Sequence, residues 1–277
     1  MLERIETYAL ILSLGLNVIF VWLLAMAGLF RWEKDLKDRV SWLGFAVVLL
    51  LLLATLVSRG VLLNRFPLAN LYESLLFFAA GFSLIFVFFL RHFAYLSLTG
   101  MITLAAILSA AFLLPETQKA ALPLIPALRS YWRIIHVPPL MVSYAFFLMA
   151  AFTGLAYLFT EWLFKREQSE QQEKLAFYQE GIYRCISFGF PLLTFGIITG
   201  AVWANQSWGN LWQWDPKENL ALATWFCYAA YLHLRMTGKA SERVLAWISI
   251  IGILATYMTY IGINQFDLGG LHTYGKV

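Results

Sequence analysis

Histidine is the side chain of this sequence best suited to bind a transition metal, because neutral imidazole is a common iron ligand. The chain has only four: His92, His136, His233 and His272. His136 precedes an apolar run that begins at Val137-Pro138-Pro139, and His272 lies near the C-terminus, just after Gly269-Gly270. If both lie on one face, they can supply the two axial ligands of a haem iron. The alternative is a pair of unrelated surface histidines.

A tryptophan-rich tract, Trp208 to Glu218, lies between His136 and His272 in the sequence, and it holds three tryptophans within seven residues. Indole offers a flat apolar face with one polar edge. A porphyrin is a flat apolar disc with a carboxylate edge, so the tract suits it as a platform. A membrane-interface belt also enriches tryptophan. That alternative does not explain the glycine, the spacing or the acidic end of the tract.

The end of the tract, Asp215-Pro216-Lys217-Glu218, has the pattern of a helix start. Aspartate at the N-cap, proline at the first helical position and glutamate two positions later predict a capping box. Such a cap would fix the loop rigidly against the helix, which is compatible with a role in a binding site.

His233 lies 17 residues after Pro216, or about 26 Å along a helix that rises 1.5 Å per residue. An ionisable group inside a membrane helix is costly and tends to be functional. The alternative, which burial cost does not separate from the first, is that the His233 side chain only reaches toward the membrane interface. His92, beside Arg91, has the position of an interface residue, and Glu73 beside Asn70 and Tyr72 is expected to be structural at the membrane boundary.

The elements that position these residues are predicted to be membrane helices. Of the 277 residues, 61% are hydrophobic and 13% are charged, with mean hydropathy +0.69, far more apolar than a soluble domain. The prediction is an all-α polytopic protein with about eight transmembrane helices. The apolar stretches are Thr7–Phe30, Ser41–Ser58, Leu71–Leu90, Phe93–Leu114, Val137–Thr160, Ile182–Ala204, Pro216–Met236 and Val244–Ile263.

No soluble domain is expected, so residues 1–277 form a single integral membrane domain. The charged segment Glu161 to Gly181 is predicted to be a solvated loop helix. Cys185 and Cys227 form no CxxC pair, so both are taken as buried small apolar residues. The net charge of +4 is spread along the chain, which disfavours nucleic acid as a partner.

The distribution of Lys and Arg orients the chain. Eight helices place both termini on one side, whose loops hold eight basic residues against twelve on the other. The clusters Arg31 to Arg39 and Arg235 to Arg243 are then cytoplasmic, and both termini lie outside. His136, the tryptophan tract and His272 share the outer face, while His233 lies close to the inner boundary.

The tract resembles the tryptophan-rich WWD signature of haem-handling proteins in cytochrome c maturation, and the chain is similar to the CcsA (ResC) family of system II. Flanking segments carry the same resemblance. They are Leu128 to Trp132 leading to His136, Ser143-Tyr144-Ala145, and Gly270 to Gly275. The match covers residues 128–275, with the tryptophan loop at 205–218, whereas residues 1–127 match only in being helical.

The resemblance implies a role for each site residue. His136 and His272 would be the axial ligands of an outer haem, and His233 would bind a second haem iron within the membrane, opposite a histidine of the partner protein CcsB (ResB). No catalytic residue is assigned beyond this haem site. The haem platform would comprise Trp208, Gly209, Trp212, Trp214, Asp215 and Glu218.

The resemblance also implies a function. Haem b would move from the cytoplasmic side to the outer face and be presented to an apocytochrome c with a CxxCH motif. The chain would be the haem-handling subunit of a holocytochrome c synthase (haem lyase) complex, and catalysis could belong to the chain or to the complex. A bacterial cytoplasmic membrane is expected, with the thylakoid as the alternative.

Three other readings compete with this one. A CcmC or CcmF type of system I shares the tryptophan tract, but eight helices and the C-terminal Gly-Leu-His-Thr-Tyr-Gly favour CcsA. A di-haem membrane cytochrome would need four histidines paired across helices, and two of these lie in loops. A solute transporter using His233 as a proton relay would leave the tryptophan tract unexplained.

Overall fold

The computed structural model describes residues 2–120, 123–124, 126–163, 169–266 and 269–270. Within these ranges the chain forms helices and no strands, so the all-α prediction is confirmed. The chain divides into two compact units, Met1–Arg129 (unit 1) and Ser130–Val277 (unit 2).

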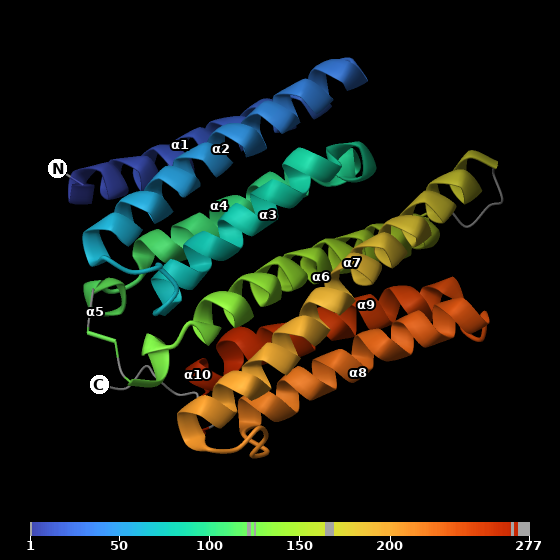
Figure 1. Ribbon diagram of the computed structural model, residues 1–277. Helices are drawn as coiled ribbons and strands as arrows, with labels where there is room; N and C mark the ends of the chain where they lie inside the picture. Colours follow the sequence, from blue (N-terminus) through green and yellow to red (C-terminus); the bar gives the residue numbers. More distant parts are fainter. Residues whose placement is uncertain (1, 121–122, 125, 164–168, 267–268, 271–277) are drawn as a thin grey trace. The chain divides into compact units, whose positions relative to one another are not determined.

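Unit 1 contains four long helices that are drawn from blue to green in Figure 1. They are α1 (Leu2–Leu29), α2 (Lys34–Leu63), α3 (Leu71–Phe93) and α4 (Ser97–Leu113). Helix α1 contacts α2 and α4, and α3 contacts the same two helices, so the four form a closed bundle. A 3-10 turn (η1, Ala94–Leu96), a short helix (α5, Glu116–Lys119) and a second 3-10 turn (η2, Pro126–Arg129) complete the unit.

Small residues let the helices of unit 1 approach closely. Phe45 of α2 stacks on Phe86 of α3 with ring centroids 4.0 Å apart. A Cβ atom at Gly100 of α4 would lie 2.4 Å from the Phe86 ring. Since real Cβ contacts are never that short, glycine at this position is what admits the aromatic ring into the core.

Unit 2 is a second closed bundle, coloured from green to red in Figure 1. Its long helices are α6 (Trp132–Leu163), α7 (Ser169–Trp208), α8 (Pro216–Thr237) and α9 (Glu242–Tyr257). Helix α6 contacts α7 and α9, and α8 contacts the same two. A π-helical segment (η3, Met258–Gly262) extends α9 and leads into α10 (Ile263–Gln265).

The core of unit 2 is also aromatic, with Phe147 of α6 stacked on Tyr228 of α8 at 3.6 Å between ring centroids. Cys185 is buried and Cys227 is partly buried, and both are free thiols. The interpretation of the cysteines as small apolar residues is therefore confirmed for Cys185, and Cys227 differs only in being partly accessible.

Three predicted helix boundaries were wrong. Helix α3 is kinked at Phe89 (φ −116°, ψ 15°) but continues to Phe93, so Arg91 and His92 lie in its last turn and the turn η1 follows them. Helix α6 begins at Trp132 and not at Val137, and the Ser130 hydroxyl accepts the Trp132 N–H at 3.3 Å. Pro138 and Pro139 therefore lie inside the helix. Residues 169–181 are the start of α7 and not a separate loop helix, because a single glycine is tolerated within a helix.

Seven helical segments of the described chain are long and apolar enough to cross a membrane, one in each of α1, α2, α3, α6 and α7, one from Ala94 to Leu113, and one from Glu242 to Gly262. The protein is therefore an integral membrane protein. Helix α8 is not among the seven, although its 22 residues span about 33 Å. The count of eight spans stays a prediction.

Candidate functional site

The tryptophan-rich loop joins α7 to α8 at one end of unit 2. Gly209 ends α7 with φ +82°, and its N–H donates to the Asn205 carbonyl at 2.9 Å, which is the usual position of glycine at a helix end. Trp212 and Trp214 meet edge to face, with ring centroids 6.1 Å apart. Trp214 is 70% exposed, so this loop presents an aromatic surface outward.

Trp214 has φ +58°, a conformation that bulky residues rarely adopt. Hydrogen bonds on both sides stabilise it. The Glu218 carboxylate accepts the N–H groups of Gln213 at 2.8 Å and Asp215 at 3.2 Å, and Asn219 donates to the Trp214 carbonyl at 2.9 Å. The loop is thus held by the first turn of α8.

The predicted capping box is present. The Asp215 carboxylate accepts the Lys217 N–H at 2.9 Å, and Asp215 is only 5% exposed. Asp215 and Glu218, which were predicted to form part of the haem platform, therefore bond to backbone N–H groups of the loop and of the first turn of α8. This geometry suits them to hold the tryptophan-rich loop in place.

Gly270 lies directly beside Asp215. A Cβ atom at Gly270 would lie 2.3 Å from Asp215 Oδ2, and Gly270 has φ +103°. Only glycine fits this approach and this backbone conformation. His272 lies two residues further on, outside the described residues.

His136 lies in the second turn of α6, and its ring packs against α7. Its Nδ1 is 2.7 Å from the Gly196 carbonyl oxygen. A Cβ atom at Gly200 would lie 2.5 Å from the ring, and Trp203 meets the ring edge to face at 5.6 Å. A carbonyl can only accept, so Nδ1 carries the proton and Nε2 is the nitrogen with a lone pair for a metal.

The two halves of this site lie at the same end of unit 2. Gly200, which contacts His136, is eight residues from Trp208 on α7, or about 12 Å along the helix axis. The Ser130 hydroxyl before α6 bonds to Gln206 of α7 at 2.8 Å. Arg133, 4% exposed, adds a buried cationic side chain one turn before His136.

His233 is not part of this cluster. It is exposed near the opposite end of α8, about 26 Å from Pro216 along the helix. Within the described residues, no three His, Cys, Asp or Glu side chains could hold a metal ion together. The side chain of His92 also lies outside the described part of the chain.

The partners of His136 were missed in the sequence, although a signal existed. Gly196-Ile-Ile-Thr-Gly200 is a small-xxx-small pattern, which marks close approach of membrane helices. Trp203 follows on the same face of α7, seven residues after Gly196. Because His136 lies on the neighbouring helix α6, this pattern on α7 indicates where its ring packs.

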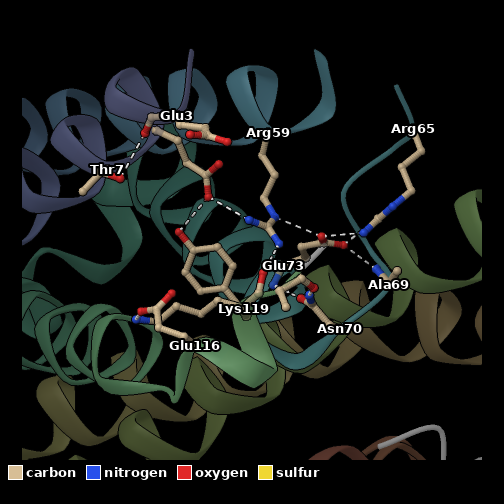
Figure 2. A network of polar contacts seen from close by, with 12 residues as sticks. Glu3, Thr7, Arg59, Arg65, Ala69, Asn70, Glu73, Glu116 and Lys119 are labelled. Carbon is tan, nitrogen blue, oxygen red and sulfur yellow. Dashed lines mark hydrogen bonds and ion pairs between the residues drawn. The ribbon is translucent and has the colours of Figure 1, made fainter. Parts of the chain in front are cut away.

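A network of buried charges in unit 1 was only partly foreseen. Figure 2 shows Glu73 of α3 accepting from Arg59 of α2 at 2.9 Å and from both terminal nitrogens of Arg65 at 2.8 Å. Glu73 also accepts the Ala69 N–H, and Asn70 caps α3. Arg59 reaches Glu6 of α1 at 2.9 Å. The structural role expected of Glu73 is confirmed.

Comparison with known proteins identifies the chain's relatives. The sequence model described as cytochrome C assembly protein matches residues 68–270. The chain belongs to this family. The match includes His136, the tryptophan-rich loop, His233 and Gly270, and it begins just before Glu73.

Several relatives of similar length carry the name cytochrome c biogenesis protein CcsA. The protein of Synechococcus sp. (strain RCC307) is 37% identical over 96% of this chain and 95% of its own length. That of Prochlorococcus marinus (strain MIT 9303) is 38% identical over 96% and 93%, and that of Mesostigma viride is 34% identical over 99% and 98%. The resemblance to CcsA is confirmed, and this family member acts in cytochrome c biogenesis.

Among solved structures, the fold matches a protein named cytochrome c heme lyase CcmF, with TM-score 0.65 and 16% identity. The alignment covers 95% of this chain and 48% of the other, so the chain spans about half the length of that protein. The fold of this chain therefore recurs within a longer protein.

Proposed function

We propose that this cytochrome c assembly protein binds haem b beside its tryptophan-rich loop and presents it for covalent attachment to an apocytochrome c. The observation that carries the proposal is the hydrogen bond from His136 Nδ1 to the Gly196 carbonyl oxygen at 2.7 Å. A bond of this kind orients an iron-binding imidazole and sets the tautomer that offers Nε2 to the metal.

The remaining donors fit a haem. His272 would supply the second axial ligand, since Gly270, two residues before it, lies beside Asp215 at the start of α8. Trp208, Gly209, Trp212 and Trp214 would face the porphyrin, while Asp215 and Glu218 position them. The buried positive charge of Arg133 favours the negatively charged propionates.

The chemistry at this site would be thioether formation. With the vinyl groups directed outward, each thiol of a reduced CxxCH motif adds across one vinyl double bond. Sulfur bonds to one vinyl carbon and hydrogen to the other, so no electrons are gained or lost. The histidine of the same motif then replaces one of the two protein ligands, and the product leaves.

A partner membrane protein of the CcsB (ResB) type would complete the system. The exposed face of α8 bears a stripe at alternating spacings of four and three residues: Asn219, Ala223, Phe226, Ala230, His233 and Thr237. This spacing suits packing against another helix, with small residues allowing close approach. His233 would lie in that seam, where a partner histidine could join it on a second haem iron.

We propose that the protein lies in a bacterial cytoplasmic membrane with both termini on the outer side. Haem would reach His233 from the inner side and His136 at the outer face. Attachment would then belong to the complex, with this chain as its haem-handling subunit.

Absorption spectroscopy tests the proposal. The reduced spectrum of the purified protein, co-expressed with its CcsB-like partner, should be that of low-spin bis-histidine haem. His136→Ala and His272→Ala should each weaken it, and added imidazole should restore it. His92→Ala is the matched control and should leave it unchanged. Haem content indifferent to both substitutions would remove the outer site, and no haem in the intact complex would overturn the haem proposal.

A further inference from the structure

A groove on unit 2 has no part in the proposed function. It has a volume of about 470 Å³ and is lined by Leu158, Glu161, Trp162, Arg243 and Trp247. The groove is shallow and open, so it suits a group that lies at the protein surface. Glu161 and Trp162 lie in the last turn of α6, and Arg243 lies in the first turn of α9.

The position of the groove relative to the bilayer follows from the helices that form it. Both α6 and the segment Glu242–Gly262 are long and apolar enough to cross a membrane. The groove lies where one span ends and the other begins, so it faces the headgroup region whichever way the chain is oriented. Tryptophan and arginine are typical side chains at this depth.

The charges in the groove balance each other. Arg243 Nε donates to Glu161 Oε2 at 3.0 Å, and the arginine side chain is 64% exposed. This bond uses the Nε–H, whereas the guanidinium carries further donors on its two terminal nitrogens. A ligand that approaches the pair therefore meets one positive and one negative group side by side.

The apolar part of the groove is aromatic. Trp162 is 67% exposed and Trp247 is 52% exposed, and Leu158 lines the groove between the two helices. An indole face attracts a cation, and its apolar body suits the glycerol and upper acyl region of a lipid.

We propose that this groove binds the headgroup of a zwitterionic phospholipid, with the phosphate at Arg243 and the ammonium at Glu161 between the two tryptophans. An anionic lipid without an ammonium would leave Glu161 facing a second negative charge. A porphyrin would bring two carboxylates to the same glutamate. Charge complementarity thus favours a zwitterion, and the proposal is independent of the haem site.

Native mass spectrometry of the full-length protein in detergent tests this inference. Phosphatidylethanolamine and phosphatidylglycerol with the same acyl chains are added together, and the first retained lipid is measured. We expect a preference of about threefold for phosphatidylethanolamine. Glu161→Gln should reverse the preference, since an arginine without its carboxylate attracts the anionic lipid. Loss of folding cannot produce such a reversal.

The matched control is Glu180→Gln, because Glu180 forms an exposed pair with Arg184 on α7, at 2.7 Å, outside the groove. This variant should keep the preference of the unaltered protein. Equal retention of the two lipids by the unaltered protein would overturn the proposal. So would a Glu161→Gln variant that still prefers phosphatidylethanolamine, or displacement of the retained lipid by equimolar haem.

Discussion

Units 1 and 2 have the same order of helix contacts but keep their polar side chains in different arrangements. In unit 1, Glu73 is fully buried and bonds to Arg59 and Arg65, so charges neutralise each other inside the bundle. In unit 2, His136 and Asp215 bond instead to backbone groups at 2.7 and 2.9 Å. The first arrangement joins side chains of several helices, whereas the second fixes single side chains.

This difference teaches which unit can accept a ligand. A buried ion pair whose partners are all satisfied has nothing left to offer a substrate, and disrupting it is costly. A histidine oriented through Nδ1 has Nε2 as the nitrogen that would bind a metal, and a capped loop can expose aromatic rings without losing its shape. On this comparison unit 1 has the features of a scaffold, and unit 2 is the unit in which we propose the haem site.

The largest effect is expected from Glu73→Ala in unit 1. This substitution removes the shared partner of Arg59 and Arg65. Arg59 keeps its pair with Glu6, but Arg65 loses both of its bonds to the carboxylate, and breaking a buried ion pair of this kind costs about 3–5 kcal/mol. Thermal unfolding in detergent should show a large loss of stability. Glu116→Ala is the matched control, because the Glu116 side chain is 89% exposed in its pair with Lys119, and it should change little. Equal melting temperatures for the two variants would contradict the scaffold role.

Gly200→Ala tests unit 2 in the complementary way. The added methyl group would lie 2.5 Å from the His136 ring and force Nδ1 away from the Gly196 carbonyl. Losing such an orienting bond weakens metal binding about 10- to 100-fold. Haem titration of the purified protein should show this loss with the fold retained. The control is Gly15→Ala, because a Cβ atom at Gly15 would meet nothing within 4 Å, and this variant should bind haem as the unaltered protein does. If Gly200→Ala bound haem with the affinity of the unaltered protein, the Gly196 carbonyl would have no role in positioning His136.

Gly270→Ala should have an intermediate effect. It combines a backbone at φ +103° with a contact of 2.3 Å to Asp215 Oδ2, and such strain costs about 1–3 kcal/mol. We expect the C-terminal segment to shift and the haem spectrum to resemble that of His272→Ala. Gly238 also has a positive φ, +62°, but a Cβ atom there would meet no neighbour within 4 Å, so Gly238→Ala is the control without a close contact. If both variants showed the same change in the haem spectrum, a positive φ alone would explain that change, and the contact with Asp215 would not be needed.

The fold and the base of the site followed from short-range patterns. Apolar runs long enough for a bilayer predicted the helices, and Asp215-Pro216-Lys217-Glu218 predicted the capping box that the structure contains. These features depend on neighbouring residues, so the sequence carries them directly. Helix boundaries were predicted less well. Helix α6 begins before Pro138 and Pro139, because Ser130 can cap the start of a helix that contains them.

Contacts between distant residues could not be predicted in the same way. The pairing of His136 with Gly196 joins residues 60 positions apart, and that of Arg59 with Glu6 joins residues 53 apart. Each depends on which helix faces are apposed, which composition does not determine. Asp215 and Glu218 were expected to contact haem. Their bonds to backbone N–H groups suit them to hold the loop in place. Residue spacing alone could not distinguish that role from direct contact with haem.

The smallest effect, from Asp215, distinguishes these two tasks. Asp215→Ala removes the N-cap of α8 and should cost about 1 kcal/mol, measured as a small fall in the unfolding temperature. Asp215→Asn keeps an acceptor at the cap, so it should retain stability and the haem spectrum if Asp215 acts by capping. If the asparagine variant instead behaves like the alanine variant, the negative charge is what matters. Lys217, whose charge interacts with Asp215, would then be the group to substitute next.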